Sequence, residues 1–216
     1  MIHELIQTPS VACTYLAEMR DETIQKDRMR FRLNLERLGE CMAIELSKHL
    51  NYADQSVTTS LGKATVNQLV HQPVLATILR AGLPMHQGML RMLDHADVAF
   101  AAAYRQTQPD GDFTIEIDYI STGSIEGRTL VLVDPMLATG ASMIGVYRRL
   151  RAYGNPASVH IVSAIASRHG ISEVEQAMPA GTHIWTGAID EELTTKGYIL
   201  PGLGDAGDLA FGSKIG

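Results

Sequence analysis

The chain has 216 residues, of which 45% are hydrophobic and 19% are charged, and 18 Lys and Arg against 24 Asp and Glu give a net charge of −6. This length suits a single domain with one substantial core. The acidic balance offers no general attraction to nucleic acid or to an anionic membrane surface. Apolar runs such as Val74–Leu79 are far shorter than the roughly 20 residues of a transmembrane helix. We therefore predict one domain, residues 1-216, with no nucleic-acid partner and no membrane partner.

The residues present also indicate the cellular compartment and the metal binding to expect. The segment from Met1 to Ile6 lacks the basic and apolar regions of a secretory signal, which favours a cytoplasmic protein. Cys13 and Cys41 are the only cysteines, so we expect two reduced thiols and no disulfide framework. The eight histidines include no pair spaced four residues apart and no nearby cysteine pair, so the sequence predicts no protein-bound zinc site.

Residues 1-70 are predicted to form a helical N-terminal region. From Asp21 to about Leu50, apolar residues recur every three or four positions, which is typical of one face of a long packing helix. The residues of this face are Phe31, Leu35, Leu38, Met42, Leu46 and Leu50.

Strand and helix patterns alternate beyond residue 70. This alternation predicts an α/β fold with an open, mostly parallel sheet and flanking helices. The expected strands are Val74–Leu79, Val98–Ala103, Thr129–Val133 and Val159–Ile165, and the expected helices are Leu83–Leu93, Ala141–Arg151 and Ile171–Met178.

One further segment, Phe113–Ile120, alternates apolar and polar residues with a period of two. The turn-forming residues Pro109-Asp110-Gly111-Asp112 precede it. We expect a half-exposed β-hairpin arm that serves as a lid or as a dimer contact.

The strongest local motif follows the strand Thr129–Val133. An acidic residue, Asp134, ends this strand, and a loop of small residues then opens into a helix. Ligands of parallel α/β sheets bind at the carboxyl ends of strands, where loop amides and a helix N-terminus face an anion. Residues 138 to 142 are therefore a candidate phosphate cradle, and Asp134 is a candidate acceptor for sugar hydroxyls. The alternative is a plain turn between strand and helix, capped by Ser142.

Two arginines occupy similar positions near strand ends. Arg80 follows the strand Val74–Leu79, and Arg105 follows Val98–Ala103. A guanidinium group can hold a phosphate with two hydrogen bonds, so together with the loop these arginines indicate a multiply phosphorylated substrate. Taken singly, each arginine also fits a surface ion pair.

The C-terminal segment Gly197–Asp208 contains four glycines and two aspartates after a short apolar run. So many glycines bring backbone amides and carbonyls close to a partner, and such a wall suits a flat, neutral ligand with donors and acceptors on its edge. The alternative is a glycine-rich tail that turns over the surface.

These motifs, in this order, resemble the uracil phosphoribosyltransferase family. Asp134–Ser142 is similar to that family's signature for phosphoribosyl diphosphate (PRPP), and its Asp-Pro pair points to the uracil branch. Ile78–Leu83 and Tyr104-Arg105 resemble the loops that meet the diphosphate, and Tyr198–Asp208 resembles the uracil-binding segment. The resemblance covers about residues 75 to 216. Ala141 and Pro84 stand where the family usually has glycine, and Leu209 where a basic residue is usual.

The resemblance implies the phosphoribosyltransferase fold and the transfer of ribose 5-phosphate from PRPP to uracil, which gives UMP and diphosphate in pyrimidine salvage, with Mg²⁺ as cofactor. It implies a PRPP-binding core over residues 71-190 and a base-binding segment over 191-216. It assigns Arg80, Arg105 and Asp205 to catalysis. It assigns to PRPP the residues Arg80, Arg105, Asp134, Pro135, Met136, Leu137, Ala138, Thr139, Gly140, Ala141, Ser142 and Asp205, and to uracil Ile199, Gly204, Asp205 and Ala206.

Further properties stay open at this point. The hairpin arm favours a homodimer or homotetramer. Some members of the family respond to GTP or CTP, and no motif in this sequence shows whether this protein does. A regulatory RNA-binding protein on the same fold would need a basic face, which the net charge of −6 does not favour. A purine enzyme would normally carry two adjacent acids where this chain has Asp134-Pro135.

Overall fold

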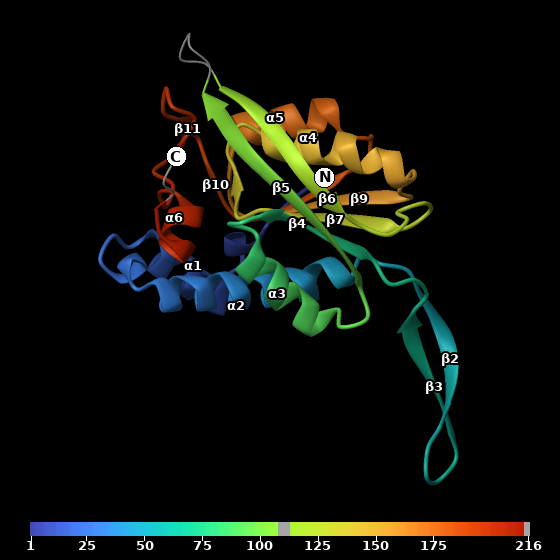
Figure 1. The fold of residues 1–216 in the computed structure, drawn as a ribbon. Coiled ribbons are helices and arrows are strands. Elements are labelled where there is room, and N and C mark those ends of the chain that lie inside the picture. The colour runs from blue at the N-terminus through green and yellow to red at the C-terminus, as the bar shows by residue number, and fades with distance from the viewer. Residues whose placement is uncertain (108–112, 214–216) are drawn as a thin grey trace.

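The computed structural model describes residues 1–107 and 113–213, and within that range it leaves out the side chains of residues 105–107, 113 and 114. A central sheet carries helices on both faces (Figure 1). All neighbouring strands are parallel except the last pair, β5 and β6, which confirms the predicted α/β fold. In spatial order the strands are β1 (Ile2–Glu4), β10 (His183–Asp190), β9 (Ser158–Ser167), β7 (Thr129–Val133), β4 (Val74–Leu79), β5 (Asp97–Thr107) and β6 (Phe113–Ser121), and the short β8 (Met136–Leu137) pairs with β9.

The central strands are the ones that continuous apolar runs predict. β4 and β7 coincide with their predicted ranges, while β5 and β9 are longer at both ends. β4 and β7 are apolar at nearly every position because helices cover both faces of the parallel sheet. β10 was not predicted, because its sequence HIWTGAID mixes polar with apolar residues.

The helices form two layers with separate cores (Figure 1). α1 (Val11–Arg20), α2 (Arg28–Ser47) and α3 (Leu83–Met92) cover one face, and α4 (Ala141–Leu150) and α5 (Arg168–Ala177) cover the other. A sixth helix, α6 (Ala206–Phe211), packs beside α2. The three helices predicted beyond residue 70 are confirmed to within a few residues.

The N-terminal region differs from the sequence prediction in two respects. The expected helix from Asp21 begins only at Arg28, because the side chain of Asp27 caps it by accepting hydrogen bonds from the amides of Met29 and Arg30. The helical character also ends at Ser47. Residues 52–69 instead form an antiparallel hairpin of β2 (Tyr52–Thr58) and β3 (Lys63–Leu69), which projects away from the body (Figure 1). Almost all of its residues are exposed, so no hydrophobic pattern marked it.

The predicted hairpin arm is the ribbon of β5 and β6 (Figure 1). Its base forms the edge of the main sheet, and the register shifts between Ala102 and Ala103. The predicted turn at residues 109–112 lies outside the described residues. The roles of the arm as a lid or dimer contact stay predictions.

Two smaller expectations concern the membrane and the thiols. Within residues 1–107 and 113–213, no helix has both the length and the apolar character needed to cross a bilayer. Cys13 and Cys41 are both free thiols, as expected.

Candidate active site at the carboxyl edge of the sheet

A cavity of about 220 Å³ opens where β4 and β7 end. Three segments far apart in sequence supply most of its lining: the loop after β4, the loop after β7 and the C-terminal segment. The predicted site residues that line it are Arg80, Asp134, Met136, Ala138, Thr139, Gly140, Ala141, Ser142, Gly204, Asp205 and Ala206.

The loop after β7 has the geometry of an anion cradle. Gly140 adopts a left-handed backbone with φ of 76°, and α4 starts at the next residue, so the helix N-terminus faces the cavity. Asp134 is half-buried, and its Oδ1 accepts a hydrogen bond from the amide of Met136 at 3.2 Å. Pro135 and Leu137 are buried and are not among the lining residues that the described structure contains.

Two residues of the neighbouring segment hold this loop from behind. The buried hydroxyl of Ser167 donates to the carbonyl of Ala138 at 2.6 Å and accepts from the amide of Gly170 at 2.8 Å. A Cβ atom at Gly170 would lie 2.3 Å from the carbonyl oxygen of Ala138, so only glycine fits there. The sequence pattern did not single out either residue, because their role depends on the packing of α5 against the loop.

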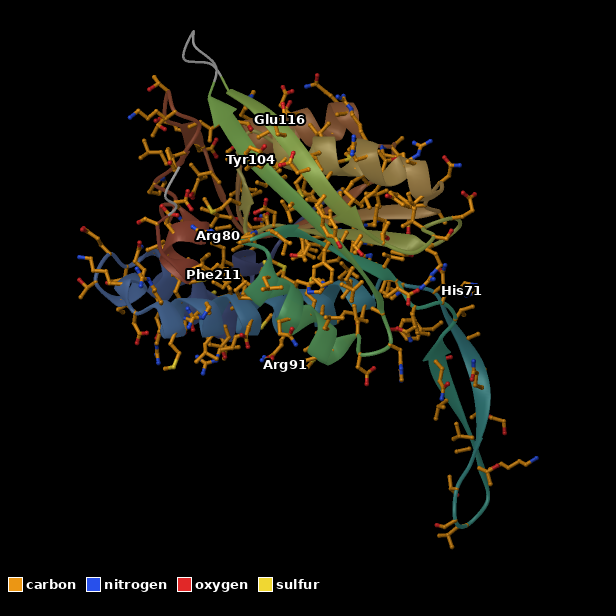
Figure 2. The ribbon with its side chains drawn as sticks, viewed as in Figure 1. His71, Arg80, Arg91, Tyr104, Glu116 and Phe211 are labelled. Carbon is orange, nitrogen blue, oxygen red and sulfur yellow. The ribbon has the colours of Figure 1, made fainter. Side chains whose placement is uncertain are left out.

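Arg80 lies at the end of β4 and faces α6, with Phe211 of that helix nearby (Figure 2). Its Nη2 donates to Oδ1 of Asp208 at 2.8 Å and to the carbonyl of Gly212 at 2.6 Å. Its Nε is buried and, among the described atoms, has no hydrogen-bond partner. Arg80 lines the cavity, so its guanidinium group is placed near a bound anionic ligand.

The second arginine, Arg105, lies within β5, opposite Ile115, because that strand continues to Thr107. Its side chain is outside the described part of the structure. The preceding residue, Tyr104, does line the cavity (Figure 2). A hydrogen bond to the carboxylate of Asp118 raises the pKa of Tyr104 above its usual value, so this phenol stays protonated.

The C-terminal segment forms the remaining wall. Gly204, Asp205 and Ala206 face the cavity, and the carboxylate of Asp205 caps α6 by accepting from the amide of Asp208 at 3.0 Å. The segment is shaped by a short antiparallel pair of β11 (Glu192–Leu193) and β12 (Ile199–Leu200). Ile199 is buried in the core and is not among the lining residues of the described structure.

An ion pair that the sequence pattern did not indicate fixes this wall. The guanidinium of Arg20, at the end of α1, makes two hydrogen bonds of 2.8 and 2.9 Å to the carboxylate of Asp190. Both residues also bind Gly202: Arg20 donates to its carbonyl at 3.0 Å, and Asp190 accepts from its amide at 3.0 Å. The N-terminal helix therefore holds the segment that leads into the cavity wall.

The cavity has two chemically different sides. Loop amides, hydroxyls and Arg80 on one side suit a phosphorylated group, and main-chain groups of the glycine-rich segment on the other suit a flat ring. Asp134 and Asp205 place carboxylates at the same cavity, and carboxylate oxygens are ligands that Mg²⁺ prefers. An open parallel sheet with such a cavity at its carboxyl edge is the architecture of a phosphoribosyltransferase.

Comparison with known proteins identifies the branch. A sequence model described as uracil phosphoribosyltransferase matches residues 5–213. A uracil phosphoribosyltransferase of Porphyromonas gingivalis is 48% identical over 93% of each chain, and that of Thermococcus gammatolerans is 38% identical over 93% of this chain and 88% of its own. A solved protein structure from Aquifex aeolicus matches all of both chains with a TM-score of 0.87 and 30% identity. The chain belongs to the uracil phosphoribosyltransferase family, which confirms the resemblance.

Proposed function

We propose that this protein transfers the ribose 5-phosphate unit of PRPP to N1 of uracil and releases UMP and diphosphate, as in pyrimidine salvage. The observation that carries the proposal is the convergence of the loop at residues 134–142, Arg80 and the segment at 204–206 on one cavity. This convergence joins a phosphate-binding side to a base-binding side in one cavity.

The loop side would hold the sugar phosphate. The N-terminus of α4 faces the cavity, and the hydroxyls of Thr139 and Ser142 line it, so both can donate to phosphate oxygens. Asp134 would accept hydrogen bonds from the ribose hydroxyls, since a carboxylate is a strong acceptor.

The leaving group would be stabilised by positive charge. Departure of diphosphate from C1′ builds negative charge on its oxygens, and Arg80 would stabilise this charge from the cavity wall. Arg105 is proposed as a second contact, and Mg²⁺ is proposed to enter with PRPP, with Asp205 on the metal side. The metal would supply charge neutralisation of the diphosphate.

Base choice would rest on the main chain. Main-chain groups of Gly204 and Ala206, next to Asp205, would present a donor and acceptor pattern that no side-chain rotation can reverse. Ile199, which does not line the cavity in the described structure, is proposed as a further main-chain contact. Uracil offers an N3–H donor and an O4 acceptor, whereas cytosine reverses both. With about 1–3 kcal/mol for each group left unsatisfied, uracil should be preferred over cytosine by roughly 30-fold to 10⁴-fold.

The test is a nucleobase screen with PRPP and Mg²⁺. We expect turnover with uracil and 5-fluorouracil, weak or no turnover with cytosine, and none with hypoxanthine or guanine. Omission of Mg²⁺ should abolish turnover. A binding assay with single-stranded RNA, run in parallel, covers the regulatory alternative. Turnover with a purine, or RNA binding without turnover of uracil, would overturn the proposal.

A substitution at Arg80 tests the proposed contact with the diphosphate. Loss of a charge-assisted contact that strengthens in the transition state costs about 2–4 kcal/mol, so Arg80→Ala should lower kcat/KM for PRPP by roughly 30- to 1000-fold. Arg91→Ala is the control, because Arg91 is exposed on α3 and pairs with Glu36 and Glu40 (Figure 2). Equal activity of the two variants would remove Arg80 from the site.

The remaining partner assignments are also proposals. We place the enzyme in the cytoplasm as a homodimer or homotetramer. The predicted arm of β5 and β6 stays one proposed contact, and we add the projecting hairpin of β2 and β3 as a second. A two-stranded hairpin alone is only marginally stable in water, and Leu61 at its tip is 98% exposed. Whether GTP or CTP regulates the enzyme is tested by adding each to the uracil assay.

A further inference from the structure

Three histidines meet at the end of the sheet opposite the cavity. His3 lies in β1, His49 follows α2, and His183 begins β10, so they come from three separate elements. One ring nitrogen from each lies within 4.8 Å of the others. The cavity lies at the carboxyl ends of β4 and β7, whereas His183 is at the amino end of a parallel strand, so this cluster is separate from the candidate active site.

The spacing of the ring nitrogens is close to that of a metal site. Zinc–nitrogen bonds are about 2.0–2.1 Å long and tetrahedral, which places two ligand nitrogens about 3.3 Å apart. Nε2 of His3 and Nδ1 of His183 are 3.0 Å apart and make a hydrogen bond to each other, which a bound ion would replace. The third ligand, His49, is exposed after the end of α2, and its ring nitrogen lies within 4.8 Å of the other two, so a small movement of this side chain would complete the set.

The ring of His3 is held in place by its neighbours. The indole of Trp185 stacks on it, with ring centroids 3.7 Å apart and planes 6° apart. The Nε1–H of Trp185 in turn donates to Nδ1 of the buried His160 at 3.1 Å. Fixed ligand orientation of this kind strengthens metal binding because less ordering is needed when the ion arrives.

We propose that His3, His49 and His183 form a binding site for a zinc-type divalent transition metal, which ties β1 and the end of α2 to β10. Three imidazoles without a carboxylate favour Zn²⁺, Cu²⁺ or Ni²⁺ over Mg²⁺, which prefers oxygen ligands. The site is therefore distinct in metal preference from the magnesium chemistry proposed for the reaction. Water can complete the fourth position on the exposed side.

The chain contains its own probe for this site. Trp185 is the only tryptophan, and it stacks on one of the three ligands. In protein without a histidine tag and freed of metal by a chelator, Cu²⁺ should quench the tryptophan fluorescence and saturate at one equivalent. Excess Zn²⁺ should shift the Cu²⁺ titration to higher copper concentration, because both ions compete for the same ring nitrogens, whereas millimolar Mg²⁺ should not.

Two variants distinguish metal binding at the three histidines from metal binding elsewhere on the protein surface. His49→Ala should weaken Zn²⁺ and Cu²⁺ binding on the order of 100-fold or more, since removal even of an outer-shell partner costs 10- to 100-fold. His95→Ala is the control, because His95 is exposed and lies outside the cluster. Zn²⁺ should also raise the melting temperature of the wild type and of His95→Ala but not of His49→Ala.

Circular dichroism and uracil turnover without added Zn²⁺ should be unchanged in His49→Ala, since this exposed residue is distant from the cavity. Equal copper titrations for wild type and His49→Ala would overturn the proposal. So would the absence of Zn²⁺ binding at micromolar concentration, or displacement of Cu²⁺ by Mg²⁺.

Discussion

Arg20 illustrates, at the residue scale, how the C-terminal wall of the cavity, the proposed base side, depends on a distant side chain. Its ion pair with Asp190 and their shared contacts to Gly202 hold the segment that carries the cavity wall. Arg20→Ala should lower kcat/KM for uracil by roughly tenfold or more, because the remaining carboxylate, 8% exposed, loses its partner.

A positioning role for Arg20 differs from general destabilisation of the protein in which substrate is affected. PRPP affinity, measured by calorimetry, should change far less than KM for uracil. Arg20→Lys should recover only part of the loss, because an ammonium group cannot reproduce the two-pronged contact. Equal losses for both substrates would contradict this role.

His86 links a single residue to the pH dependence of stability. It is 1% exposed on α3, and desolvation by burial lowers its pKa below the usual 6.5. Below about pH 6.5 the unfolded chain therefore binds a proton that the folded chain does not. Stability is fully present above that pH and falls as pH decreases toward the folded pKa, by up to about 1.4 kcal/mol per pH unit.

Denaturant unfolding across this range measures the effect. His86→Leu should show a shallower decline of unfolding free energy with falling pH than the wild type. His95→Leu, at an exposed position, should keep the wild-type slope. A variant at position 86 with an unchanged slope would show that another group carries the dependence.

Residues that act within one local segment were the ones that the sequence could predict. Residues 134 to 142 were identified because strand, loop and helix follow one another directly, and the structure places most of them at the cavity. Arg20 and Asp190 are 170 residues apart, so no local pattern joins them. The three clustered histidines escaped notice for the same reason, because spacing rules detect ligands on one helix and not on three elements.

At the scale of elements, α2 and α3 cross with their backbones in close contact. A Cβ atom at Gly88 would lie 1.9 Å from the carbonyl oxygen of Glu36, and one at Gly39 would lie 2.2 Å from that of Met85. Gly88→Ala should therefore separate the helices and lower the free energy of unfolding by about 3 kcal/mol.

The matched control is Gly123→Ala, since an added Cβ there meets nothing within 4 Å. Chemical denaturation should leave this control within about 0.5 kcal/mol of the wild type. A Gly88 variant as stable as the control would contradict the close crossing.

Exposure decided which elements could be predicted. Buried strands such as β4 and β7 carry unbroken apolar runs, so their ranges were correct. β2 and β3 bury little on either face, so their hairpin was assigned to a helical region. Edge strand β1 has three residues, too few for any period to be detected.

At the scale of the whole molecule, the projecting hairpin is one proposed contact between subunits. Ala53 pairs with Gln68, so an Asn-Gly turn placed between them would replace residues 54–67 and close the strands. Sedimentation velocity should then show a smaller assembly than the wild type, while circular dichroism stays unchanged. An unchanged assembly would show that the subunits meet elsewhere.

β1 pairs with β10, and Arg20 contacts Gly202, so segments from both ends of the chain must meet to build the C-terminal wall of the cavity. During synthesis, this wall can therefore form only after the loop at residues 134–142. Arg20 leaves the ribosome 182 residues before Gly202, and β1 likewise precedes the strand that it joins. The phosphate loop can close as soon as β9 and α5 are made, because its supports Ser167 and Gly170 lie nearby. The C-terminal wall forms only after its segment reaches Arg20. A growing chain can therefore complete the loop at residues 134–142 before the C-terminal wall of the cavity exists.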